Sequence, residues 1–341
     1  MLRHLPFLRR AWLGAGPSYL ILFVTSRCHG GCGHCFNRGQ LNGADDLSHD
    51  ELLRVSATAG PLPALLLSGG EPFLRPGLEL ILASFVQHNG LSVCAIPTSG
   101  FDPEGIEAAV AAICAASPQL RLSIGVSVDG PPALNDALRY PGSFAQARAT
   151  VARLVALRQV HPLLEVFVHT VVSRRNAVAL PDFMQRVEGW GLDGHNLELL
   201  RNPDALPSMT TIRYLHRLAV AGRRRSLPPG LDRAVSIGSL RDSQLRKEHS
   251  LQGGSFPCAA GRQILVLDAD GGLRACEALA PVGNIRDFDG DLSRAVAHLA
   301  PRAPVHCDDC TNICFINASL AASPRALLRI PLGWGRAGLG L

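Results

Sequence analysis

The sequence predicts an α/β fold in which parallel strands alternate with helices. Short apolar runs recur over roughly the first 200 residues, longer amphipathic stretches separate them, and glycine-rich or polar segments directly follow the runs. Strands that alternate with helices are joined in parallel by right-handed crossovers. We therefore expect a partial (βα)6 parallel barrel with a small C-terminal module of a hairpin and a helix. An open parallel sheet would give the same alternation.

Six apolar runs are predicted as strands, and several are apolar throughout, as expected when both faces of a sheet are covered. In chain order these strands are 19–25, 64–68, 92–97, 122–128, 165–172 and 195–200. The helical segments between them include 48–60, 105–116 and 143–159. Because the loops at the carboxyl ends of parallel strands meet on one face, we expect the segments that follow the first four strands to share a site.

Composition and local pattern divide the chain into a core and smaller parts. The 47% apolar and 18% charged content is that of a globular protein with a sizeable core. The expected division is an N-terminal extension 1–18, a core domain 19–225, a linker or lid 226–257, a cysteine-containing module 258–320 and a tail 321–341. The linker or lid is rich in Gly, Pro and Ser and only weakly periodic.

The charge pattern argues against nucleic acid as a partner. The net charge is +5, but basic clusters such as 223–225 lack the interleaved aromatic residues of a single-strand binding platform. A solvated helix face explains them better. The basic N-terminus and the apolar tail are likewise better explained as packed termini than as a membrane contact.

Cysteine usage indicates a reducing compartment, and we expect a cytoplasmic protein. The first apolar run is too short for a signal peptide or a membrane span. Ten cysteines are present, and eight of them fall in two groups. In a reducing compartment clustered thiols bind metal more often than they form disulfides. The isolated Cys94 and Cys114 are expected to be small buried hydrophobic residues.

The first cysteine group, residues 28–35, is called here the three-cysteine loop. Cys28, Cys32 and Cys35 are spaced Cys-x3-Cys-x2-Cys. Three thiolates can hold three irons of a cubane cluster and leave the fourth iron open to an outside ligand. We expect the glycines of the loop to relieve steric limits on the wrap, namely Gly30, Gly31 and Gly33. The alternative is a zinc site with His29 or His34 as the fourth ligand.

These residues resemble the signature of the radical S-adenosylmethionine (radical SAM) superfamily, in which an aromatic residue precedes the last cysteine. His34 stands at that place in this chain. The resemblance implies a 4Fe-4S cluster whose open iron is chelated by the methionine end of SAM. It further implies reductive cleavage of SAM to a 5′-deoxyadenosyl radical that abstracts hydrogen from a substrate. Such chemistry requires a reductant such as flavodoxin or ferredoxin.

Further motifs strengthen the resemblance, which covers roughly residues 17–205. "SGGEP" resembles the family motif that contacts the SAM amino group, "PTSG" resembles the segment after the third strand, and "SVDG" followed by an arginine resembles the fourth. The implied SAM contacts are Gly69, Gly70, Glu71, Pro72, Thr98, Ser99, Ser127, Asp129 and Arg139. In this scheme Ser127 and Asp129 bond the ribose, and Arg139 bonds the SAM carboxylate.

The C-terminal cysteine group comprises Cys258, Cys276, Cys307, Cys310 and Cys314, with a predicted hairpin over 264–276. Its order resembles the SPASM extension of radical SAM enzymes, or its shortened form, Twitch. A full SPASM module has more cysteines, so we expect one auxiliary 4Fe-4S cluster. We favour Cys258, Cys276, Cys307 and Cys310 as ligands, with Cys314 replacing one of them or free. A zinc-stabilised hairpin is the alternative.

Substrate and reaction are the least determined part of the prediction. His169 and Glu198 lie on the fifth and sixth predicted strands and are candidate substrate contacts, and no general base is identified. We expect a small-molecule substrate such as a sugar, a cyclitol or a lipid-linked compound, because only about 18 residues precede the first strand, too few for a leader-binding domain. The alternatives are a peptide maturase and a non-catalytic iron–sulfur or zinc protein. The sequence is silent on oligomeric state.

Overall fold

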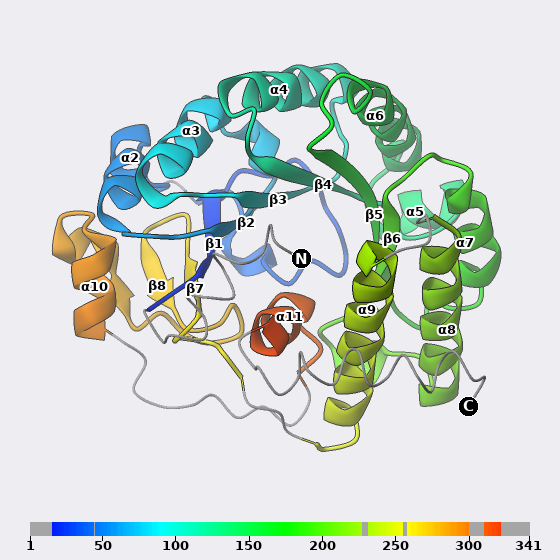
Figure 1. The fold of residues 1–341 in the computed structure, drawn as a ribbon. Helices are drawn as coiled ribbons and strands as arrows, with labels where there is room; N and C mark the ends of the chain where they lie inside the picture. The colour runs from blue at the N-terminus through cyan, green and yellow to red at the C-terminus, as the bar shows by residue number, and fades with distance from the viewer. Residues whose placement is uncertain (1–15, 44, 227–230, 255–257, 300–309, 322–341) are drawn as a thin grey trace.

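A computed structural model describes residues 16–43, 45–226, 231–254, 258–299 and 310–321 of the chain. Its strands form one sheet in the order β6-β5-β4-β3-β2-β1-β7-β8-β9, and the first six run parallel (Figure 1). These six are β1 Tyr19–Thr25, β2 Ala64–Gly69, β3 Val93–Thr98, β4 Arg121–Ser127, β5 Leu164–Val172 and β6 Gly194–Leu199. The sheet curves without closing, so the predicted partial barrel is confirmed.

Helices cover the convex side of the sheet, where α2, α3, α4 and α6 follow one another in Figure 1. The helices of the first two thirds are α2 His49–Thr58, α3 Leu78–Asn89, α4 Pro103–Ala116, α5 Pro132–Leu138, α6 Ser143–Leu157, α7 Leu180–Glu188 and α8 Met209–Ser226. The main core lies between these helices and the sheet, and outward-facing strand residues such as Leu20, Leu22 and Val24 are at most 1% exposed.

The C-terminal module continues the same sheet. Strand β7 (Ile264–Leu267) pairs in parallel with β1, and β8 (Gly272–Arg274) pairs antiparallel with β7, which confirms the predicted hairpin. Strand β9 (Gly283–Asn284) completes the sheet, and α10 spans Leu292–Leu299. The module therefore extends the core sheet beyond its first strand.

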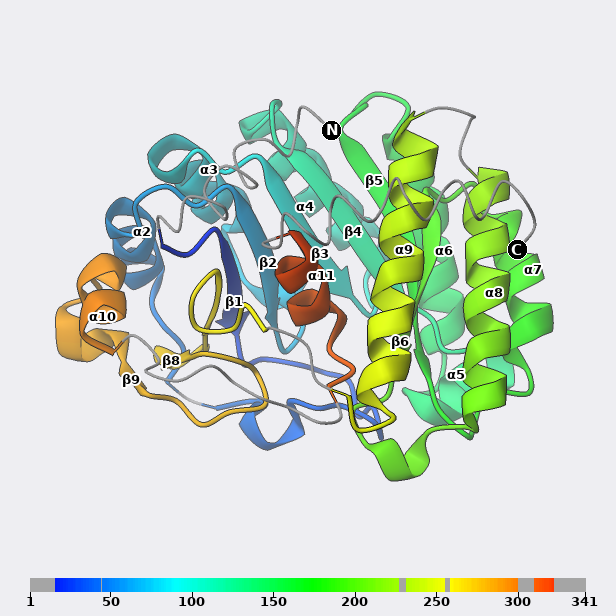
Figure 2. The same ribbon diagram turned by 60° about the horizontal axis from the view of Figure 1, so that its bottom comes forward.

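Two helices lie on the concave side (Figure 2). Helix α9 (Leu231–Ser250) occupies most of the segment predicted as a linker or lid, and α11 (Ile313–Ala321) packs beneath β1 and β7. Phe315 of α11 is fully buried in a second core cluster with Ile21 and Phe23 of β1. Thus α11 fills the part of the barrel interior next to β1.

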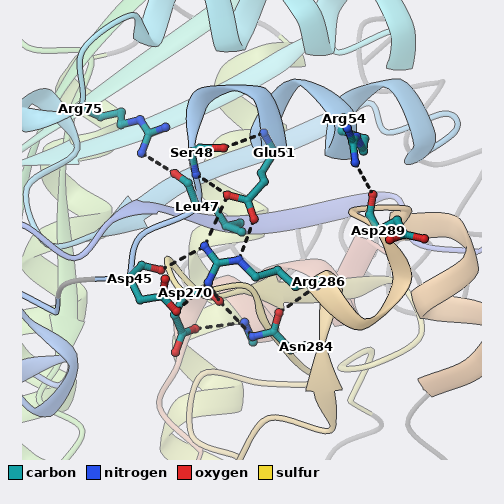
Figure 3. Close-up of polar contacts among 11 residues, drawn as sticks. Asp45, Leu47, Ser48, Glu51, Arg54, Arg75, Asp270, Asn284, Arg286 and Asp289 are labelled. Atoms are coloured by element: carbon teal, nitrogen blue, oxygen red, sulfur yellow. Dashed lines mark hydrogen bonds and ion pairs between the residues drawn. The ribbon is translucent and has the colours of Figure 1, made fainter.

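A network around Arg286 fixes the C-terminal module to α2 (Figure 3). Ser48 and Glu51 form a capping box that starts α2. Arg286 Nε donates to Glu51 Oε1 at 2.7 Å, and Nη1 donates to Asp45 Oδ2 at 2.7 Å. The Leu47 amide also donates to the Ala269 carbonyl at 2.6 Å. The C-terminal module therefore holds the loop before α2 at two points, Asp45 and Leu47.

Among the described residues, every helix is either too short or too polar to cross a lipid bilayer.

Candidate functional site

The three-cysteine loop follows β1 at the edge of the sheet where the strands end. A Cβ at Gly30 would lie 3.6 Å from the Sγ atoms of both Cys28 and Cys32, so these two thiols converge on one point. The Gly30 amide donates to Cys28 Sγ at 3.4 Å. Arg38 Nη2 donates to the Cys32 carbonyl at 2.6 Å and orders the far side of the loop.

Two of the loop glycines have open space where a side chain would begin. A Cβ at Gly31 or Gly33 would meet no heavy atom within 4 Å, and neither residue has a left-handed backbone. The polypeptide itself therefore leaves space at both positions, and their role in a loop wrapped around a cluster stays a prediction. At Gly30 a Cβ would make ordinary contacts only, with the two thiols and the Tyr140 ring.

Burial raises the pKa of both the Cys28 and Cys32 thiols. Arg139 opposes this rise at Cys32, where its Nη1 lies 4.0 Å from Sγ. The neighbouring Cys35 also raises the pKa of both thiols through its charge. The three cysteines thus lie close enough to influence one another electrostatically.

The segment after β2 packs backbone to backbone against the start of the three-cysteine loop. The Gly70 amide donates to the Thr25 carbonyl and the Glu71 amide to the Arg27 carbonyl, both at 2.8 Å. A Cβ at Gly69 would lie 2.3 Å from the Thr25 oxygen, and one at Gly70 would lie 2.1 Å from the Arg27 oxygen. Only glycine allows this approach, because both obstacles are backbone atoms.

Glu71 is 3% exposed, and its two carboxylate oxygens differ in their hydrogen bonding. Its Oε2 accepts from the Ser99 amide and from Ser99 Oγ, both at 2.8 Å. Within the described residues its Oε1 is buried without a hydrogen-bond partner of good geometry. Burial raises the Glu71 pKa, and interactions with Ser99, with Thr98 and with the Phe73 amide oppose that rise. An unpartnered buried carboxylate oxygen is suited to a ligand that brings a cation.

Asp129 follows β4 and is fully buried. It links this segment to the three-cysteine loop. Its Oδ2 lies 2.8 Å from Arg139 Nε and 3.3 Å from His34 Nε2, and its Oδ1 accepts from the Val171 amide at 2.8 Å. Asp129 thereby holds Arg139 beside the three-cysteine loop.

The region that carries the three-cysteine loop matches a known family. Residues 22–173 match the family model described as the radical SAM superfamily. This region, which is less than half of the chain, is similar to the radical SAM superfamily. The similarity to this superfamily agrees with the prediction of an enzyme, and the reaction is proposed below.

Two curated relatives align with parts of this chain. A GTP 3′,8-cyclase of Geobacter sulfurreducens is 33% identical over 92 residues, which cover 26% of this chain and 28% of that protein. A pre-heme d1 synthase of Dinoroseobacter shibae is 29% identical over 185 residues, which cover 53% of this chain and 43% of that protein. The alignments thus span less than half the length of either relative.

Solved structures of radical SAM proteins share the fold. The structure of anSMEcpe with bound AdoMet and the Cp18Cys peptide has a TM-score of 0.58 and 15% identity, covering 92% of this chain and 99% of that chain. SuiB of Streptococcus suis bound to S-adenosylmethionine has a TM-score of 0.58 and 14% identity, covering 85% of this chain and 65% of that chain. At such identities the likeness concerns the fold alone, and it agrees with the predicted barrel.

The radical SAM family implies a 4Fe-4S cluster and SAM, and the site fits both groups. The Cys28 and Cys32 thiols lie beside one point at Gly30, and the charge of Cys35 raises the pKa of both, which fits three thiolate ligands on one loop. The unpartnered Oε1 of Glu71 offers an acceptor to an amino group. Among the described residues no three His, Cys, Asp or Glu side chains are arranged to hold a single metal ion.

Both histidines of the three-cysteine loop contact other partners. The His29 ring lies 4.3 Å from that of Phe101 and 5.3 Å from that of Tyr140, centroid to centroid. His34 directs Nε2 at Asp129. Burial lowers the pKa of each imidazole. His34, at the place of the family's aromatic residue, thus contributes a polar contact there.

The remaining predicted SAM contacts lie at the same edge of the sheet. Thr98 Oγ1 accepts from the Gly100 amide at 3.0 Å, so it shapes the turn that presents Ser99 to Glu71. Pro72 begins the short helical turn after Glu71. Ser127 ends β4 in register with His169 of β5. Their contacts with SAM stay predictions.

The C-terminal cysteine group is gathered around β8 and α11. The Cys276 pKa is raised to about 12, by burial first and then by nearby Glu277, Cys310 and Cys258. Burial also raises the pKa of Cys314, on which Cys276 acts as well. Cys307 lies outside the described residues. The choice among the five predicted ligands therefore stays a prediction, while the isolated Cys94 is fully buried, as expected.

His169 and Glu198 face each other in the barrel interior. His169 Nδ1 lies 3.5 Å from Glu198 Oε1, and Asn196 Nδ2 lies 3.2 Å from His169 Nε2. A Cβ at Gly125 would lie 2.7 Å from the imidazole, so the glycine makes room for this ring. Enclosure lowers the His169 pKa, and Glu198 opposes that shift.

Sequence reasoning missed two supporting residues. Asp46 accepts from Thr25 Oγ1 at 2.7 Å and from the Ser26 amide at 2.9 Å, which fixes the chain just before Cys28. Lys247, the only lysine, is fully buried on α9 and donates to the Leu197 carbonyl at 3.3 Å. Burial lowers its pKa to about 8. No local motif marks either residue, although a solitary lysine is itself a signal.

A cavity of about 430 Å³ lies elsewhere, between α8 and α9. Its lining includes Arg213, Arg217 and Arg241, and none of the cysteines. The thiols beside Gly30 and the buried Glu71 carboxylate lie instead at the strand ends, where the sequence predicts the site.

Proposed function

We propose that this chain binds a 4Fe-4S cluster through Cys28, Cys32 and Cys35, and that it binds SAM beside Glu71. When bound, these groups supply reductive cleavage of SAM to a 5′-deoxyadenosyl radical, which abstracts hydrogen from a substrate. The observation that carries the proposal is the pairing of convergent thiols with the unpartnered, buried Oε1 of Glu71.

The chain's own residues position the SAM molecule. Glu71 Oε1 accepts from the SAM amino group, while Ser99 holds the other oxygen in place. Arg139, oriented by Asp129, provides a charge-assisted contact for the SAM carboxylate. Ser127 bonds the ribose in this proposal, whereas the fully buried Asp129, predicted as a second ribose contact, has its oxygens next to Arg139, His34 and the Val171 amide. Gly69, Gly70, Pro72 and Thr98 shape the two loops that carry these groups.

The substrate that we propose is a small hydroxylated molecule, such as a sugar or a cyclitol. His169, Glu198 and Asn196 give the barrel interior a set of hydrogen-bonding groups suited to hydroxyl contacts. Two of the solved relatives have peptides in their structures, so a peptide substrate is the second candidate.

We further propose that the C-terminal cysteine group binds one auxiliary 4Fe-4S cluster and that this cluster transfers electrons. The support is electrostatic: Cys258 and Cys310 raise the pKa of Cys276, and Cys276 raises the pKa of Cys314. The external reductant is a low-potential carrier such as flavodoxin or ferredoxin.

Anaerobic reconstitution tests the proposal directly. With dithionite and SAM, the wild-type protein should yield 5′-deoxyadenosine. A variant with Cys28→Ala, Cys32→Ala and Cys35→Ala should yield none, and Cys114→Ala is the matched control because this cysteine lies outside both groups. Zinc in place of iron under anaerobic handling, or no nucleoside from the wild type, would leave a non-catalytic metalloprotein as the explanation.

A further inference from the structure

Arg201 lies between the two cysteine groups. It follows β6, and its guanidinium carbon lies 3.6 Å from the centroid of the Phe36 ring. Phe36 directly follows Cys35. On its other side, Arg201 Nη2 donates to Glu277 Oε2 at 2.6 Å, and Glu277 directly follows Cys276. One side chain therefore contacts the sequence neighbours of a cysteine in each group.

A third segment meets at the same carboxylate. Asn312 Nδ2 donates to Glu277 Oε2 at 2.7 Å, and Asn312 Oδ1 accepts from the Cys314 amide at 3.2 Å. Asn312 lies between Cys310 and Cys314 in the chain. The Glu277 carboxylate thus links the segment of Cys276 to the segment of Cys310 and Cys314.

The burial of Glu277 favours arginine at position 201. The Glu277 side chain is 3% exposed, and the Arg201 side chain is 32% exposed. A buried carboxylate depends on its cation, because removal of one partner leaves an uncompensated charge. The flat guanidinium also stacks on an aromatic face, which an ammonium group does less well. Arginine is therefore the residue type that satisfies both contacts at once.

We infer that Arg201 is a positioning residue that couples the three-cysteine loop to the C-terminal cysteine group through Phe36 and Glu277. The meaning of the two groups as cluster sites rests on the proposed function. The coupling itself is a property of the polypeptide and can be measured without metal. It predicts that a change beside one cysteine group alters the other.

The test is the alkylation rate of individual cysteines in reduced, metal-free protein. Iodoacetamide is added anaerobically and labelling is followed by peptide mass spectrometry. Glu277→Gln, which lies beside Cys276, should accelerate labelling of the distant Cys35 about threefold or more, as coupled neighbours do. Arg201→Ala should also accelerate Cys35 labelling about threefold or more. A variant with both Arg201→Ala and Glu277→Gln should label Cys35 little faster than either single variant. Arg201→Lys, which keeps the charge, should recover part of the protection.

Arg153→Ala is the matched control, since Arg153 pairs with Glu104 and Glu107 on the outer helices. An unchanged Cys35 rate in Glu277→Gln, or an equal rise in Arg153→Ala, would overturn the inference. Should Arg201→Ala fail to fold by circular dichroism, Phe36→Leu serves in its place and should accelerate labelling at Cys276.

The outcome is separable from that of the proposed function. If the wild type makes no 5′-deoxyadenosine yet Cys35 labelling still depends on Glu277, the coupling holds and the proposed function fails. If the nucleoside forms and labelling is independent of Glu277, only the coupling fails.

Discussion

At Glu71, burial and an unfilled hydrogen-bonding position act on the same carboxylate. Ser99 satisfies Oε2 with two donors, while Oε1 has no partner of good geometry among the described residues. Burial raises the Glu71 pKa, which means that the isolated site disfavours the charged form. A bound cation would reverse that preference, because it stabilises the carboxylate. Residue-scale energetics therefore point to a cationic ligand at Oε1.

Replacement of Glu71 by Gln should weaken SAM binding to the reconstituted protein by about 10- to 100-fold, the cost of one charge-assisted hydrogen bond. The Gln carbonyl can still accept from Ser99, whereas its NH2 group cannot accept from an amino group. Equilibrium dialysis with labelled SAM measures the change. Glu104→Gln, at an exposed glutamate on α4, is the control, and equal affinity in the two variants would contradict the assignment.

Gly70 and Gly31 differ in the space that the structure leaves for a side chain. Gly70→Ala should lower the free energy of unfolding by about 3 kcal/mol, because the new methyl group would meet the Arg27 carbonyl oxygen at 2.1 Å. Gly31→Ala should change it by less than about 0.5 kcal/mol, because a Cβ there meets nothing within 4 Å. Urea unfolding of reduced apo-protein compares the two. Equal effects would show that the Gly70 contact relaxes freely.

The sequence predicted which candidate residues lie at the strand ends but gave an incomplete account of their contacts. The motif placed Glu71 correctly beside the cysteines, since both follow adjacent strands. It could not show that Asp129 holds Arg139 and His34, because these residues meet only through folding. Asp46 was missed for the same reason: an aspartate in a loop carries no local sign of the strand end that it binds.

At the scale of elements, strands were predicted better than helices. Predicted strand 19–25 matches β1 fully, and 122–128 differs from Arg121–Ser127 by one residue. Apolar runs buried on both faces give a strong local signal. Helix α9 gave no such signal, because its glycine and serines weaken the pattern. Its packing against α8 and α11 supplies the stabilisation that propensity does not.

The Arg286 network makes the attachment of the C-terminal module pH-dependent. Bonds from Arg286 lower the Glu51 pKa to about 2 from its usual 4.5. A depressed carboxylate pKa stabilises the fold fully above about pH 4.5, and this stabilisation is lost as pH falls towards 2. Glu51→Gln keeps the capping-box geometry but removes the charge that Arg286 meets.

Glu51→Gln should therefore cost about 1 kcal/mol at pH 7, a value discounted for solvent screening. The difference from wild type should shrink as pH is lowered below about 4.5. Urea unfolding at pH 7, 5 and 4 measures it. Glu104→Gln, whose side chain is 81% exposed, should show no comparable loss at any of these values. A difference that grows on acidification would contradict the sign.

At the scale of the molecule, the C-terminal module is part of the core sheet. Strand β7 pairs with β1 although the two lie about 240 residues apart, so no local pattern could predict the pairing. The hairpin itself was predicted, because its turn and apolar strands are local features. This pairing brings the C-terminal cysteine group next to the strand that leads into the three-cysteine loop.

The shared sheet leads to a prediction about metal content. If each cysteine group holds a four-iron cluster, the reconstituted wild type carries about eight irons per chain. Cys276→Ala with Cys310→Ala should reduce this to about four, yet 5′-deoxyadenosine should still form, because Glu71, Arg139 and the three-cysteine loop are untouched. Iron and sulfide assays with Mössbauer spectroscopy measure the change. Cys94→Ala with Cys114→Ala should leave the iron content unaltered, since neither cysteine belongs to a group. About four irons in both the wild type and the Cys276 and Cys310 variant would remove the auxiliary cluster and leave the zinc-stabilised hairpin to be tested by zinc analysis.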